Sequence, residues 1–99
     1  MKLRVRAPGL SIPPSKVAAL QDRFRLGVGT RATGISEIDV QLSTRRPGEL
    51  RCSVLVRPQR GEMLSLEEVA DELDTAADLA LWRLRRRLFR LDLWQDEAS

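Results

Sequence analysis

Five arginines lie within eight residues near the end of the chain: Arg83, Arg85, Arg86, Arg87 and Arg90. A planar guanidinium holds two phosphate oxygens at once, so a cluster of this density is typical of a surface that contacts a nucleic-acid backbone. Arg83 lies one helical turn before Arg87, and like charges at this spacing destabilise a helix by roughly 0.2–0.5 kcal/mol per pair. Because these arginines lower the stability of the predicted helix, a binding role explains them better than stability does. We therefore expect them to contact RNA, with a solvated surface as the alternative.

A second set of side chains suited to binding is apolar and belongs to the same predicted helix. On a helical wheel, the side opposite the predicted core stripe carries Leu79, Trp82, Phe89 and Leu93. An apolar line on a charged helix is unfavourable in water and predicts a partner that covers it. Trp and Arg are favoured anchors of protein interfaces, and aromatic rings also stack on RNA bases. We expect a two-fold homodimer through this face, with base stacking or coverage by Trp94 as alternatives.

The residue types that most enzymes and metal sites need are absent or isolated. The sequence has no histidine and one cysteine, Cys52, so neither a zinc site nor an intrachain disulfide is expected. Cys52 is in phase with apolar neighbours, which predicts a small buried side chain. Glu67 and Glu68 could suggest acid–base catalysis, but the first turn of a helix explains them better. We expect no catalysis, no cofactor, no metal and no small-molecule substrate.

The bulk composition is that of one small globular domain. With 99 residues and 42% hydrophobic content, the chain supports one modest core. The net charge is only +3, so attraction to RNA would have to come from a local patch. The sequence shows neither the apolar run of a signal peptide nor a segment long enough to span a membrane. We expect a cytoplasmic protein without a membrane partner, with one domain over residues 1–93 and a short acidic tail over residues 94–99.

Apolar residues that alternate with polar ones predict the strands. This pattern covers residues 2–6, 37–43 and 50–57, and the last two segments are joined by a turn at Arg46-Pro47-Gly48. A shorter fourth strand is predicted over residues 62–64. The first segment should place Arg4 and Arg6 on the polar face of the sheet, where ion pairs with Glu37 and Asp39 are expected.

Helical spacing predicts two helices. The first begins at Pro13-Pro14 and has Gly27 as its C-cap. The second runs from Leu66 to Leu91 with Ser65 as its N-cap. Its predicted core face consists of Val69, Leu73, Ala77, Ala80, Leu81, Leu84, Leu88 and Leu91. The element order is therefore β-α-β-β-β-α, which predicts an α+β fold with a four-stranded sheet and two helices packed on one face.

Two segments resemble a known family: LRVRAPGLSIPPSKVAALQDRF near the start and LDTAADLALWRLRRRL in the second helix, where Asp78 matches a family aspartate. With the element order, they are similar to the short hibernation-promoting-factor and ribosome-associated-inhibitor A family. The resemblance implies non-catalytic binding to the small ribosomal subunit and its rRNA. It also implies inhibition of translation in idle ribosomes, because the protein would occupy the path of mRNA and tRNA. The matching positions imply RNA contacts by Arg83, Arg86, Arg87, Arg90, Lys16, Arg23 and Arg25.

The chain also departs from this family. Its net charge of +3 is low for the family, and the residues that follow Leu91 are acidic where short members often end basic. These departures keep open a protein-interaction or dimerisation module of the same fold that has lost ribosome binding. A general binder of double-stranded RNA is a third possibility.

Overall fold

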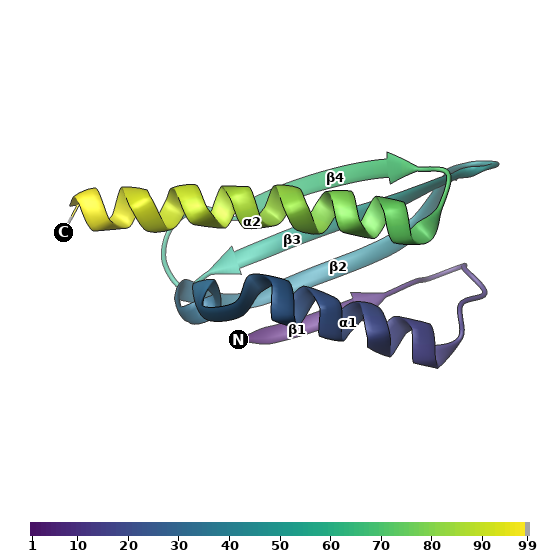
Figure 1. Cartoon of the computed structure of the whole chain (residues 1–99), viewed down its shortest axis with the longest axis horizontal. Helices are drawn as coiled ribbons and strands as arrows, with labels where there is room; N and C mark the ends of the chain where they lie inside the picture. Colours follow the sequence, from purple (N-terminus) through teal and green to yellow (C-terminus); the bar gives the residue numbers. More distant parts are fainter. Residues whose placement is uncertain (99) are drawn as a thin grey trace.

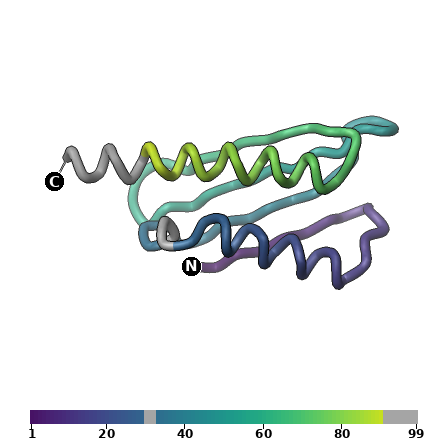
Figure 2. Tube along the Cα trace, in the orientation of Figure 1, coloured from purple at the N-terminus to yellow at the C-terminus, as the bar shows by residue number. Residues whose placement is uncertain are grey.

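The computed structural model describes residues 1–29 and 33–90 in full, and of residues 30–32 and 91–98 it describes only the helical backbone (Figure 2). The elements follow the predicted order β-α-β-β-β-α, with a short 3-10 helix, η1 (Gly29–Gly34), after the first helix. The strands are β1 (Lys2–Arg6), β2 (Ile35–Arg46), β3 (Glu49–Pro58) and β4 (Leu64–Ala70). The helices are α1 (Pro14–Val28) and α2 (Leu73–Ala98).

The four strands form one mixed sheet in the spatial order β1-β2-β3-β4. β1 is parallel to β2, whereas β2, β3 and β4 are joined as antiparallel neighbours. Both helices lie side by side on the same face of the sheet, with α1 beside β1 and α2 over β3 and β4 (Figure 1). The predicted α+β fold, with its four-stranded sheet and two helices on one face, is therefore confirmed.

The core lies between the sheet and the helices and follows from the alternation of the strands. Ile38, Val40 and Leu42 of β2 are fully buried against the helices, while the residues between them face the open side. Cys52 of β3 is also fully buried, as its phase predicted. The helices contribute buried Leu20, Phe24, Val28, Ala76, Ala77, Ala80, Leu81, Leu84 and Leu88.

The hairpin between β2 and β3 forms at the predicted turn. Thr44 pairs with Leu50 and Arg46 pairs with Glu49, which leaves Pro47 and Gly48 at the tip. Gly48 has a φ of 80°, a conformation that glycine adopts without strain and that follows proline in a type II turn. The local turn chemistry thus fixes the register of the two longest strands.

The predicted start of the second helix is wrong by several residues. Residues 64–70 form β4, which pairs with β3 from Leu50 to Val56, and α2 begins only at Leu73. Ser65 is therefore not a helix cap, Glu67 and Glu68 do not lie in a first turn, and Val69 does not belong to the core face. The segment has good helix formers, but hydrogen bonding and packing beside β3 override this preference.

Gly27 was predicted as the C-cap of the first helix, and this is also wrong. The helix continues through Val28, and its C-cap is Gly29 with a φ of 54°. Gly27 instead lies at the contact between the helices, where a Cβ atom would be 2.8 Å from Leu81 Cδ1. The missing side chain thus allows α1 and α2 to approach closely.

Candidate nucleic-acid interface

Four of the five clustered arginines line one hollow on α2. Arg83, Arg86, Arg87 and Arg90 surround a space of about 210 Å³, which we call the arginine hollow. Spacings of three and four residues place them on neighbouring turns of one helix face. Arg86, Arg87 and Arg90 form no ion pair with any side chain that the structure describes. The hollow therefore concentrates positive charge that the described side chains leave largely unneutralised.

Arg83 differs from the other three because β4 holds it. Its Nη1 lies 3.1 Å from Glu68 Oε1 and donates to the backbone oxygen of Glu67 at 3.3 Å. The Arg83 side chain is 48% exposed, so its guanidinium still reaches solvent at the edge of the hollow. The contact fixes the position of Arg83 but offsets part of its charge. Sequence reasoning missed this partner because it placed Glu68 on the same helix as Arg83.

The apolar line on α2 lies at the surface. Leu79, Trp82 and Phe89 are 42%, 58% and 50% exposed, respectively. The guanidinium carbon of Arg86 lies 4.8 Å from the centre of the Trp82 ring, a cation–π contact. Arg86 therefore belongs to the arginine hollow and also borders the apolar line. The predicted contribution of Leu93 and the alternative cover by Trp94 lie outside the described side chains, as does the core position of Leu91.

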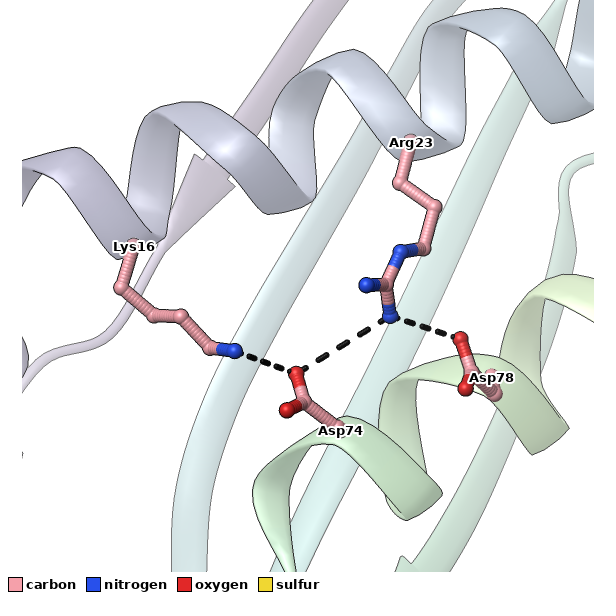
Figure 3. A network of polar contacts seen from close by, with 4 residues as sticks. All are labelled: Lys16, Arg23, Asp74 and Asp78. Atoms are coloured by element: carbon pink, nitrogen blue, oxygen red, sulfur yellow. Dashed lines mark hydrogen bonds and ion pairs between the residues drawn. The ribbon is translucent and has the colours of Figure 1, made fainter.

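The predicted RNA-binding cations of α1 do not join the arginine hollow. Lys16 Nζ lies 2.6 Å from Asp74 Oδ1, and Arg23 Nη1 lies 2.8 Å from Asp78 Oδ1 (Figure 3). Both acids belong to the first turns of α2, away from the hollow. Arg25 faces its own helix, 3.9 Å from Asp22. The structure thus divides the predicted RNA-binding residues into an open cluster on α2 and a paired set on α1.

Electrostatics at the seam between the helices stabilise the ionised form of Asp74. The hydrogen-bonding contact with the Lys16 ammonium holds the pKa of Asp74 below its ordinary value, and the charge of Arg23 acts in the same direction. Arg23 Nη1 lies 3.9 Å from Asp74 Oδ1, so one guanidinium approaches both acids. Two cations and two carboxylates form a locally neutral network.

The open face of the sheet carries charges of both signs. Arg6 of β1 pairs with Asp39 of β2 at 2.7 Å, which confirms one of the predicted cross-strand ion pairs. Glu37 is 3.7 Å from Arg57 of β3, so its partner belongs to the opposite neighbouring strand. This face also has a depression of about 370 Å³ between β1 and β4, bordered by Arg6, Asp39 and Glu67. Because the two signs lie close together here, the sheet attracts a polyanion less than α2 does.

Two further findings concern the part of the chain that the structure describes. Within it, His, Cys, Asp and Glu side chains form no group of three or more that could hold a metal ion. Among the same residues, no helix is both long enough and apolar enough to cross a membrane.

Solved structures that are similar to this chain share its α+β fold. A ribosomal subunit interface protein from Coxiella burnetii matches 94% of this chain and 99% of its own length, with a TM-score of 0.79 at 16% identity. The N-terminal domain of Protein Y from Thermus thermophilus matches 92% of this chain and 99% of its own, with a TM-score of 0.74 at 20% identity. No family model matches the sequence, and no curated protein matches it significantly. The chain thus has the fold that the family resemblance implied.

Proposed function

We propose that this protein binds rRNA of the small ribosomal subunit and inhibits translation by occupying the path of mRNA and tRNA. The observation that carries the proposal is the arginine hollow, where four arginine side chains of α2 line one space. Its support is the fold, which is shared with a protein described as a ribosomal subunit interface protein. The role is non-catalytic and belongs to the cytoplasm, where ribosomes are.

The arginine hollow suits a phosphate backbone in both charge and geometry. A guanidinium donates several N–H groups in one plane, so it binds two oxygens of one phosphate or one oxygen of each of two phosphates. Arg83 is fixed by Glu68, whereas Arg87 and Arg90 have no described acidic partner to release before they bind. Because the net charge of the chain is only +3, this local concentration must supply most of the attraction.

The first prediction concerns binding to purified small subunits. We expect the native chain to co-sediment with them at low salt and to dissociate as salt rises, because each neutralised phosphate releases counterions. Changing Arg83, Arg86, Arg87 and Arg90 to glutamine should abolish co-sedimentation and inhibition of translation in a reconstituted system. Each lost phosphate contact should lower the salt slope by about one unit.

A matched control removes four positive charges elsewhere. Arg45, Arg46, Arg57 and Arg60 are exposed and belong to the β2–β3 hairpin and the turn that follows β3. Their replacement with glutamine should retain most of the binding, since the hollow is intact. Equal losses of binding in the two variants would mean that binding depends on net charge and not on the arginine hollow. A native chain that stays in the supernatant at low salt would rule out the ribosomal proposal.

A second candidate function is a protein-interaction role through a homodimer, and the apolar line favours it. Trp82 and Phe89 are half-exposed on α2. The helix carries Asp74 and Asp78 near its start and arginines farther along. An antiparallel pairing of two copies centred on Trp82 would place Asp78 of one copy opposite Arg86 of the other. Because Arg86 also lines the arginine hollow, such a dimer would compete with RNA.

A further inference from the structure

We propose that Asp74 and Asp78 are specificity-determining residues of the RNA interface. They hold Lys16 and Arg23 away from phosphate and thereby confine RNA to the arginine hollow at the other end of the described part of α2. This inference rests on the proposed RNA binding and assigns a role to two acids within it. It concerns the seam between α1 and α2, where Figure 3 shows all four side chains directed toward one another.

The seam pairs every one of its four charges. Lys16 and Arg23 are two turns apart on α1, and Asp74 and Asp78 are one turn apart on α2. Lys16 contacts Asp74 at 2.6 Å, and Arg23 contacts Asp78 at 2.8 Å and Asp74 at 3.9 Å. Each cation therefore already has a carboxylate where a phosphate would otherwise bind.

These ion pairs are close to solvent, so RNA could reach the cations if the acids were absent. The side chains of Lys16 and Arg23 are 36% and 43% exposed, and those of Asp74 and Asp78 are 50% and 61% exposed. An exposed network of this kind contributes little to folding stability. Its larger effect is on charge, because it makes the seam neutral while the arginine hollow stays positive.

Distance and ion pairing together limit the effect of the acids on the hollow. Asp74 and Arg87 are separated along the helix by about 20 Å at a rise of roughly 1.5 Å per residue, which is more than twice the Debye length of about 8 Å at physiological ionic strength. Asp78 is only about 8 Å from Arg83 by the same rise, but Arg23 at 2.8 Å offsets its charge. A phosphate strand along α2 would be attracted at one end only. Removal of the acids would extend the basic surface across both helices. Such a surface favours the binding of RNA of any sequence and shape.

The test compares two variants that change net charge equally. In the first, Asp74→Asn with Asp78→Asn frees Lys16 and Arg23. In the second, Asp71→Asn with Glu72→Gln removes two acids at the same end of α2, which make no ion pair with a described residue. Each protein is titrated with a short mixed-sequence RNA duplex and with purified small subunits over a range of salt concentrations, and circular dichroism checks the fold.

For the first variant we expect affinity for the duplex to rise about tenfold or more, and the salt slope to steepen by about two units, one per freed cation. Affinity for subunits should rise less, so selectivity for the subunit should fall. The second variant should show a smaller gain without the steeper slope. Equal gains in both would overturn the proposal, because they would show a general charge effect.

A third variant tests the cations directly. Lys16→Gln with Arg23→Gln, added to Asp74→Asn with Asp78→Asn, restores a neutral seam and the native net charge, so it should cancel both the gain in RNA affinity and the steeper salt slope. A quadruple variant that keeps the gain would overturn the proposal, because the freed cations would then not be its cause. If the native chain binds subunits but removal of the acids does not raise RNA affinity, only the role of the acids is overturned. Failure of the native chain to bind subunits overturns the proposed function itself.

Discussion

Cys52 shows how a single residue's chemistry is decided by its place in the sheet. It faces the helices from β3 and is fully buried. Burial raises the pKa of its thiol to about 12, because the thiolate would lose its hydration. The thiolate is the reactive form of cysteine, so the native protein holds this residue in an unreactive state.

A labelling experiment follows from this position. We expect iodoacetamide at mildly alkaline pH to leave Cys52 unmodified in the native protein and to alkylate it fully in guanidinium chloride. Intact mass measures the extent of labelling in each case. Alkylation at similar rates in both conditions would contradict the burial of this residue.

The arginines of α2 show what can be predicted from residue spacing and what cannot. Their number and spacing predicted an RNA-binding cluster, and four of its members, Arg83, Arg86, Arg87 and Arg90, line one hollow. The partner of Arg83 could not be predicted in the same way. Glu68 lies 15 positions earlier on another element, so the ion pair depends on how β4 and α2 pack together.

At the scale of elements, the contact between the two helices depends on Gly27. A Cβ atom at this position would lie 2.8 Å from Leu81 Cδ1 and 2.9 Å from Cδ2. Leu81 is itself buried, so its methyl groups have little room to move. A side chain here must therefore separate the helices or force Leu81 out of its rotamer.

We expect Gly27→Ala to lower the free energy of unfolding by about 1 kcal/mol. Overpacking destabilises a core by roughly 1–3 kcal/mol, which outweighs a helix-propensity gain of about 1 kcal/mol for alanine over glycine. Gly34→Ala is the matched control, because a Cβ atom there has nothing within 4 Å and no positive φ is involved. Urea denaturation measures both. A Gly27→Ala variant at least as stable as the native chain would show that Leu81 yields easily.

The elements also differ in how far the sequence predicts them. The first three strands follow from local alternation and the Pro47-Gly48 turn, so their positions are close to those predicted. The fourth strand was predicted over residues 62–64 and overlaps β4 only at Leu64, because residues 65–70 have helix-forming side chains and become a strand by pairing with β3. β3 and β4 are separated along the chain by a turn, so their pairing cannot be predicted from the residue pattern of either segment alone. The same error displaced the start of α2.

At the scale of the whole molecule, acidic and basic side chains are separated along the part of α2 whose side chains the structure describes. Asp71, Glu72, Asp74 and Asp78 lie at or near its start, and the arginine hollow lies farther along. The family resemblance assigned RNA contacts to both helices, but the structure gives α1 cations acidic partners. This could not be predicted from the sequence, since it depends on the two helices lying side by side.

The same polarity makes self-association a specific and testable alternative. In an antiparallel pair of α2 helices the acidic start of each copy would face the arginines of the other. Trp82 would lie at the centre with its cation–π partner Arg86 beside it. Such a pair is closed by its two-fold axis, so it predicts a dimer and not a larger assembly. RNA should dissociate it, because phosphate and the second copy would compete for Arg86.

The last prediction therefore concerns mass in solution. We expect the native chain to be a dimer at tens of micromolar by sedimentation equilibrium, and Trp82→Glu with Phe89→Glu to be a monomer, because the two carboxylates would make the apolar line polar. Leu26→Glu with Met63→Glu is the matched control, since these side chains are 82% and 51% exposed and belong to α1 and to the segment before β4. This control should remain a dimer. A monomeric native chain would exclude the homodimer at this concentration and leave the apolar line to another partner.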